Sequence, residues 1–119
     1  MSEMELKEYF FVFLRRNNEY KTPSKQRDEE IYSSHFSFIN QQIEAKNMLV
    51  AGPLDGAGGL YFFDSQGKTK EDIYNLVKND EAVKSGIFIP EVHKWFVPNH
   101  TIIFTFEEYN KIKRTPTSK

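Results

Sequence analysis

Two residues of this 119-residue chain, His35 and Asp80, have side chains that can donate or accept protons, and their positions in the sequence are consistent with the lining of a pocket. His35 lies in a stretch with helical spacing, residues 24–46, and at 100° per residue it falls inside the apolar arc of that helix. An imidazole on that face is either a hydrogen-bonded core group or a group that lines a pocket between helix and sheet. Because histidine titrates near neutral pH, the second interpretation makes His35 a candidate general acid or base.

Asp80 is the second candidate. It follows the end of a predicted helix and precedes the segment Glu81–Ser85, which Gly86 is placed to end. One interpretation is that the Asp80 carboxylate caps a short helix over that segment. A capping carboxylate has a second oxygen, which it can present to a neighbour such as His35. The capping role and a catalytic role are therefore compatible.

A glycine-rich turn is the third feature. Residues 49–59 read LVAGPLDGAGG and hold four of the six glycines. Glycine is costly to order, so such a turn indicates a close backbone approach or the wall of a site. Gly52, Pro53 and Asp55 are candidate substrate-binding residues, with backbone N–H groups around Gly52 and Asp55 as donors to a developing oxyanion. Asp55 also fits ordinary turn chemistry. Arg15, at the exit of the first strand, is a candidate for binding an anionic substrate.

The elements that must position these residues follow from the hydrophobic pattern. Strands are predicted at 9–14, 48–54, 60–63 and 87–97, with helices at 24–46 and from a Thr69 cap to about 79. This β-α-β-β-α-β order predicts the α+β class and a ferredoxin-like fold with an antiparallel sheet. A strand-like run at 101–106 predicts an extra C-terminal strand.

Details of the pattern add five expectations. The run YFFVFL at 9–14 is apolar at every position, which favours a central strand covered on both faces. Pro90 favours an edge strand or a bulge. Thr22 or Ser24 caps the first helix, and Asp72 completes a capping box with Thr69. His93 is expected to face solvent or a subunit partner.

The composition predicts a single domain over residues 1–113, with a core at 9–97 and a mobile polar tail at 114–119. Sixteen basic and seventeen acidic residues provide no basic field for nucleic acid or a membrane. The absence of cysteine excludes thiolate metal sites and a Cys nucleophile, and three scattered histidines argue against a zinc site. We therefore expect neither a metal nor another cofactor. The acidic start, Met1–Glu5, and the lack of a long apolar run predict a cytoplasmic protein.

The order and spacing of four motifs over residues 9–97 resemble those of the YCII-related (YciI-like) family. The motifs are HFSFI from His35, VAGP ending at Pro53, GGLYF from Gly58, and ND ending at Asp80 followed by VKSGIF. The resemblance implies a ferredoxin-like fold that dimerises sheet to sheet as a dimeric α+β barrel, and an active site formed by His35 and Asp80. Related proteins include a dehydrochlorinase that acts on a chlorinated hydroxyhydroquinone. Glu81 departs from the family, which often has proline after this aspartate.

The leading hypothesis is a homodimeric, cofactor-free enzyme in which His35 is the general acid or base and Asp80 orients its ring. It would catalyse an elimination or isomerisation of a small cyclic or aromatic substrate. Two alternatives stay open. One is a non-catalytic ligand-binding or accessory domain, with His35 and Asp80 as a buried hydrogen-bonded pair. The other is a cofactor-free monooxygenase or haem-binding protein of the dimeric α+β barrel group.

Overall fold

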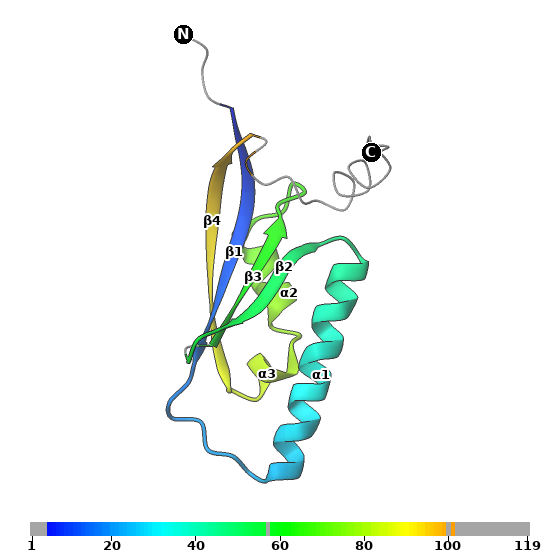
Figure 1. Ribbon diagram of the computed structural model, residues 1–119, viewed down its shortest axis with the longest axis vertical. Helices are drawn as coiled ribbons and strands as arrows, with labels where there is room; N and C mark the ends of the chain where they lie inside the picture. The colour runs from blue at the N-terminus through cyan, green and yellow to red at the C-terminus, as the bar shows by residue number, and fades with distance from the viewer. Residues whose placement is uncertain (1–4, 57, 100, 102–119) are drawn as a thin grey trace, which may run out of the picture.

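Four antiparallel strands and three helices form the part of the chain that the structure, a computed structural model, describes: residues 5–56, 58–99 and 101. In chain order they are β1 (Leu6–Arg16), α1 (Lys25–Glu44), β2 (Met48–Leu54), β3 (Gly58–Asp64), α2 (Lys70–Val77), α3 (Glu81–Lys84) and β4 (Phe88–Pro98). The strands form one sheet in the order β2-β3-β1-β4. All three helices lie on one face of this sheet (Figure 1).

The predicted β-α-β-β-α-β order and ferredoxin-like fold are confirmed, and α3 adds one helical turn before β4. Its range agrees with the short helix expected after Asp80. The predicted strand at 101–106, apart from Thr101, lies outside the described residues. The predicted domain end at 113 and the tail at 114–119 also lie outside them.

The central strand β1 differs in one respect from its prediction. Phe10, Val12 and Leu14 are buried beneath the helices, whereas Phe11 and Phe13 point to the opposite face and remain partly exposed. Within the described residues, the helices thus cover one face of the strand instead of two. A run that is apolar at every position hides this difference, because both faces of the strand carry apolar side chains.

The two edge strands carry the prolines of the sheet. Pro53 lies in β2 and Pro90 in β4, where a missing N–H removes no hydrogen bond from the interior of the sheet. Pro90 pairs with Leu14 in an unbroken register, so the predicted edge position is confirmed and no bulge is needed. In β2 the register shifts between Met48 and Val50.

Capping side chains begin the two longer helices as the sequence predicts. Of the two candidate caps, Ser24 caps α1 by accepting a hydrogen bond from the Arg27 backbone N–H at 3.0 Å. In α2 the Thr69 and Asp72 side chains form a complete capping box. The backbone N–H of Thr69 donates to the Asp72 carboxylate and lowers the pKa of that group.

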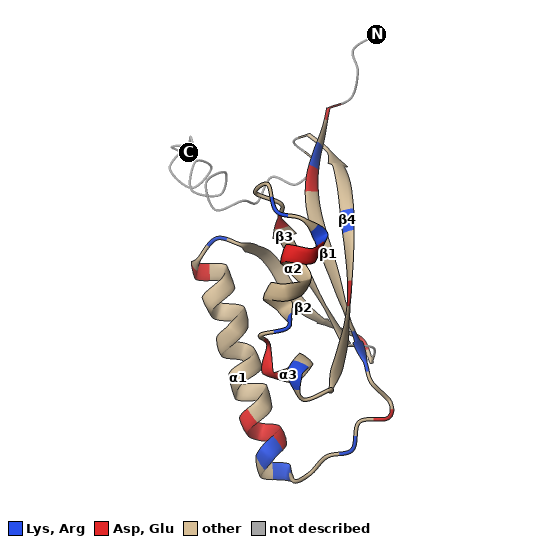
Figure 2. Ribbon diagram, turned by 180° about the vertical axis from the view of Figure 1, so that it is seen from behind, with Lys and Arg blue, Asp and Glu red and all other residues tan. Residues whose placement is uncertain are grey.

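The apolar stripe of α1 faces the sheet and brings His35 into the interior. Ile31, His35 and Phe38 are its buried residues, one helical turn apart. The charged residues of α1 gather mainly in its first turns, away from the middle of the helix (Figure 2). Among the described helices, none is both long enough and apolar enough to span a bilayer.

Candidate functional site

A buried network of three polar side chains links α1, β3 and the start of α3. His35 Nδ1 lies 2.8 Å from Asp80 Oδ2, and the Tyr61 hydroxyl donates to the same oxygen at 2.8 Å. The backbone N–H of Ala82 donates to Asp80 Oδ1 at 3.0 Å. Asp80 has 0% of its surface exposed and His35 9%. The fold thus brings the two predicted acid–base residues into direct contact, while Asp80 also caps α3.

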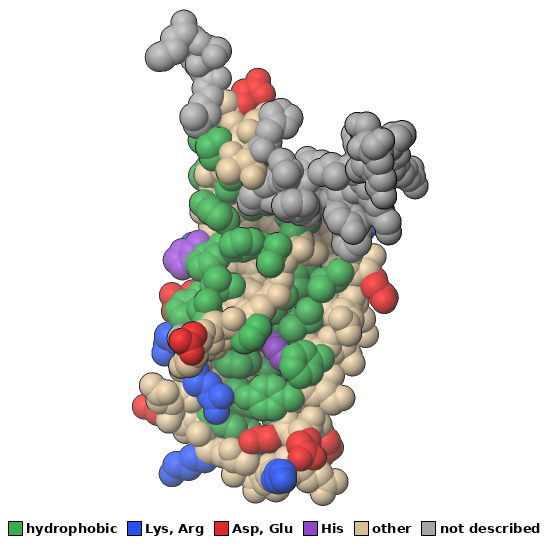
Figure 3. Space-filling model, in the orientation of Figure 1, with side chains coloured by type: hydrophobic (Ala, Val, Ile, Leu, Met, Phe, Trp, Pro, Cys, Tyr) green, Lys and Arg blue, Asp and Glu red, His purple; other side chains and the backbone are tan. Residues whose placement is uncertain are grey.

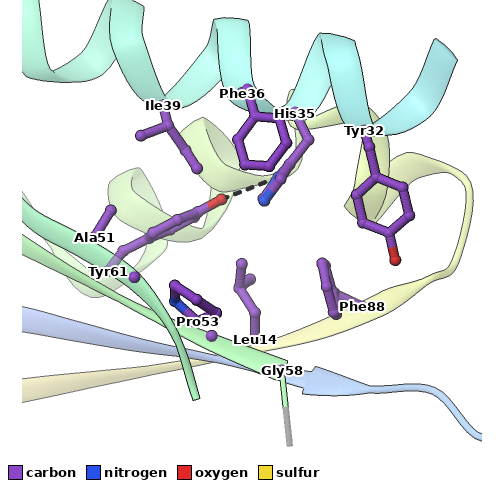
Figure 4. Close-up of a pocket in the computed structure, with 12 residues that line it drawn as sticks. Leu14, Tyr32, His35, Phe36, Ile39, Ala51, Pro53, Gly58, Tyr61 and Phe88 are labelled. Atoms are coloured by element: carbon purple, nitrogen blue, oxygen red, sulfur yellow. Dashed lines mark hydrogen bonds between the residues drawn. The ribbon is translucent and has the colours of Figure 1, made fainter. Parts of the chain in front are cut away.

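The hydrogen bonds assign the tautomer of His35. An ionised carboxylate only accepts hydrogen bonds, and Asp80 accepts them from Ala82 and Tyr61. The neutral imidazole therefore carries its proton on Nδ1 and donates it to Asp80, which leaves the lone pair on Nε2. In Figure 4 the ring of His35 points from α1 into the cavity between the helix and the sheet. Nε2 is thus the basic atom available to a bound molecule.

Tyr61 is a site residue that the sequence analysis did not single out. Burial and the adjacent Asp80 carboxylate raise the pKa of its hydroxyl, so Tyr61 remains a hydrogen-bond donor at neutral pH. Its ring also stacks with that of His35, with 6.3 Å between the ring centroids. The sequence does not reveal this role, because residues 60–63 read LYFF and no alternation shows which face of the strand Tyr61 takes.

A cavity of about 320 Å³ opens beside this network. Its size is near the lower end of small-molecule sites and suits a ligand with one ring. The lining consists of Leu14, Tyr32, His35, Phe36, Ile39, Ala51, Gly52, Pro53, Gly58, Gly59, Tyr61 and Phe88. Hydrophobic side chains gather around this region between β2 and α1 (Figure 3). A ligand in the cavity therefore meets mainly apolar walls and the imidazole of His35.

Two of the four predicted binding residues line the cavity. Gly52 and Pro53 form part of its wall, whereas Asp55 lies in the exposed turn between β2 and β3. Arg15 follows the inward-facing Leu14, so its side chain is on the opposite face of the sheet, where it pairs with Glu91 at 3.3 Å. Neither Asp55 nor Arg15 lines the cavity, and we leave both out of the proposed site.

The close backbone approach expected in the glycine-rich turn occurs at Gly58. Its φ is +106°, and a Cβ atom built there would lie 1.9 Å from the carbonyl oxygen of Leu14. Any other residue would collide with β1 at this point. At Gly52, by contrast, an added Cβ meets no atom within 4 Å. Gly58 therefore keeps β3 close to β1 at the base of the cavity.

Glu81, His93 and the third histidine of the sequence, His100, lie away from the cavity or outside the described residues. Glu81 pairs with Arg27 on the surface at 2.8 Å, so its charge is directed away from the network. His93 is exposed on the helix-free face, as expected, and its ring contacts that of Phe11. His100 lies outside the described residues. Within the described part of the chain, no three His, Asp or Glu side chains form a cluster suited to a metal ion.

Comparison with protein-family models finds no match for this chain. Comparison with curated proteins finds none either. Among solved structures, the fold is similar to that of the 5-chloro-2-hydroxyhydroquinone dehydrochlorinase TftG from Burkholderia phenoliruptrix, in complex with 2,5-dihydroxybenzoquinone. The TM-score is 0.54 at 18% sequence identity, over 73% of this chain and 92% of the other. At this identity the similarity establishes a shared fold, which is the ferredoxin-like α+β fold.

Proposed function

We propose that the cavity is the active site of a small enzyme that works without a cofactor, and that His35 is its general acid or base. One observation carries this proposal: the Nδ1 of His35 is held by a buried carboxylate while its ring faces a cavity large enough for one ring. In catalysis Nε2 takes a proton from the substrate, and Asp80 stabilises the imidazolium that results.

The surroundings of His35 favour proton abstraction followed by elimination or isomerisation of a small cyclic or aromatic substrate. The mainly apolar walls provide a less polar environment than bulk water, which strengthens the interaction between the imidazolium and any negative charge that develops on the substrate. Tyr61 and Ala82 hold the Asp80 carboxylate in place throughout. The four motifs and the shared fold also support membership of the YCII-related family as part of the proposal.

Dehydrochlorination is the first reaction to test, because a dehydrochlorinase shares this fold. The protein is incubated with 5-chloro-2-hydroxyhydroquinone and chloride release is measured for the wild type, His35→Gln and His93→Gln. His93 is the matched control, since it is an exposed histidine on the helix-free face. Loss of the general base should lower the rate about 100-fold or more in His35→Gln and leave His93→Gln unchanged. Equal rates in the two variants would contradict the proposal.

A second candidate function is non-catalytic binding of a small molecule. The hydrogen bond that Ala82 donates to Asp80 supports it, because Asp80 then has a structural role as the cap of α3. Titration with 2,5-dihydroxybenzoquinone distinguishes the two. Binding in the cavity without turnover of any chlorinated or isomerisable ring favours this second function. Turnover that depends on His35 excludes it.

We also propose that two copies of the chain associate through the helix-free face of the sheet. Aromatic side chains from three strands meet there. The ring centroid of Phe62 lies 5.9 Å from that of Phe11 and 5.1 Å from that of Trp95. Trp95 is 42% exposed and Val50 51% exposed. A second sheet packed on this face would remove these side chains from water, which is the main favourable contribution to association.

A further inference from the structure

A cationic side chain lies beside one end of the cavity and takes no part in the His35 network. Arg16 Nη1 donates a long hydrogen bond, 3.4 Å, to the hydroxyl of Tyr32, which lines the cavity. Arg16 also pairs across the sheet with Phe88, another lining residue. Because residues two apart in a strand share a face, Arg16 follows the inward-facing Leu14 on the cavity side of β1.

The pairing of Arg16 differs from that of nearby arginines. Arg15 pairs with Glu91 at 3.3 Å and Arg27 with Glu81 at 2.8 Å. Among the described residues, no carboxylate forms an ion pair with Arg16, whose partner is the neutral hydroxyl of Tyr32. A guanidinium has five N–H donors in a planar fork, so most of its hydrogen-bonding capacity is left for another group.

The lining of the cavity contains no Asp, Glu, Lys or Arg side chain. Arg16 is therefore a source of positive charge beside a cavity whose walls carry no fixed charge. In Figure 4 the ring of Tyr32 extends from α1 toward the sheet, and its hydroxyl points away from His35. The rings of Tyr32 and His35 are neighbours in the cavity wall, with 6.4 Å between their centroids. A ligand ring that packs against both therefore has one edge at the imidazole and another near the Tyr32 hydroxyl and Arg16.

We propose that Arg16, assisted by the Tyr32 hydroxyl, determines specificity for a single-ring substrate that carries an anionic oxygen group, a carboxylate or an ionised ring hydroxyl. This inference rests on the proposed function, because it concerns the substrate of the same site. The guanidinium binds the anionic group by charge-assisted hydrogen bonds at the mouth of the cavity. The apolar walls hold the ring, and the edge of the ring opposite the anionic group faces His35.

Benzoate and benzamide test the inference, because they have nearly the same shape and differ by one charge. Their affinities are measured by NMR titration of the wild type, Arg16→Gln, Arg15→Gln and Tyr32→Phe, with the His35 ring signals reporting occupation of the cavity. The wild type should bind benzoate about tenfold more tightly than benzamide. Arg16→Gln should remove that preference and Tyr32→Phe should reduce it about threefold. Arg15→Gln, which removes the same charge from the other face, should retain it.

The outcomes separate this inference from the proposed function. Equal affinity of the wild type for the two probes, or equal effects of Arg16→Gln and Arg15→Gln, would overturn the inference. In that case, binding of benzamide would still show that the cavity accepts a ring, and the chloride-release assay would still test the role of His35 as the general base. If neither probe binds to the wild type, the specificity assigned to Arg16 is rejected, whatever the result of that assay. A dispersed amide spectrum for each variant verifies that it is folded.

Discussion

At the scale of single residues, the site depends on how one buried carboxylate is satisfied. Asp80 accepts hydrogen bonds from His35, Tyr61 and the backbone of Ala82. A buried charge is costly unless such partners surround it, so each donor also stabilises the fold. The same contacts decide which nitrogen of His35 faces the cavity. Stability and the proposed chemistry are therefore coupled through this carboxylate.

Replacing Tyr61 by phenylalanine tests this coupling through pH. The pKa of Tyr61 is raised from its ordinary value of 10.0 by burial and by Asp80. The folded protein keeps the hydroxyl proton above pH 10, while the unfolded chain releases it, so the stability that Tyr61 contributes is complete below about pH 10 and decreases above it. At neutral pH, Tyr61→Phe should cost about 1–3 kcal/mol, because one hydrogen bond to the buried carboxylate is lost.

The measurement is urea unfolding of the wild type and Tyr61→Phe at several pH values from about 8 to about 11, a range that spans the ordinary titration of tyrosine. The difference in unfolding free energy between the wild type and Tyr61→Phe should narrow above about pH 10. A constant difference over this range would contradict the assigned shift of the Tyr61 pKa.

At the scale of elements, two local features set the geometry of the site. The Ser24 cap and the apolar stripe of α1 fix the start and rotation of the helix, which brings His35 toward the sheet. The β2–β3 hairpin brings Tyr61 beneath His35, with Gly58 packed closely on β1. Substitutions at Ser24 and Gly58 should therefore weaken the elements that hold the site, although neither residue belongs to the His35 network.

Gly58→Ala should destabilise the protein by about 3 kcal/mol or more, because the new Cβ meets backbone atoms of Leu14 and the φ is positive. Gly67→Ala is the matched control: its φ is +75°, but nothing lies within 4 Å of an added Cβ. Backbone strain alone should cost this control about 1 kcal/mol. Thermal and urea unfolding measure both variants, and equal losses would refute the importance of the close approach at Gly58.

Ser24→Ala should cost about 1 kcal/mol, since the Arg27 backbone N–H loses its capping partner. Ser33→Ala, at an exposed position within α1, should be neutral or slightly stabilising because alanine has the higher helix propensity. Urea unfolding again provides the measurement. A larger loss for Ser33→Ala than for Ser24→Ala would show that the cap does not set the start of α1.

At the scale of the whole molecule, the two faces of the sheet differ in character. The helices cover one face and form the cavity there, while the opposite face presents Phe11, Phe62 and Trp95 to solvent in a single copy of the chain. This arrangement leaves the cavity on the outside of the proposed dimer. Association would then stabilise the fold without closing the site.

Sedimentation tests the proposed dimer. The wild type should sediment at twice the 14.0 kDa mass of the chain. Trp95→Glu should shift it toward the monomer, because a charge would be buried within the aromatic face. Tyr74→Glu, which alters an exposed aromatic residue on α2, should leave the mass unchanged. A wild-type monomer at micromolar concentration would eliminate the dimer.

The sequence alone predicted the order of the elements, the Thr69–Asp72 capping box and the inward orientation of His35, and it narrowed the cap of α1 to Thr22 or Ser24. These features depend on spacing within short segments: apolar residues along α1, Ser24 and Thr69 ahead of helices, and proline at the edge strands. Such signals can be interpreted without knowing what packs against the segment.

The tertiary structure alone decided that Tyr61 completes the network and that Arg16, not Arg15, lies on the cavity side of β1. Residues 9–14 are apolar at every position, so no alternation in the sequence reveals which face the following arginine shares. The contact between Tyr61 and Asp80 joins two elements whose approach depends on the register of the sheet and the packing of the helices on it. Register and packing are properties of the assembled fold, and short-range patterns do not contain them.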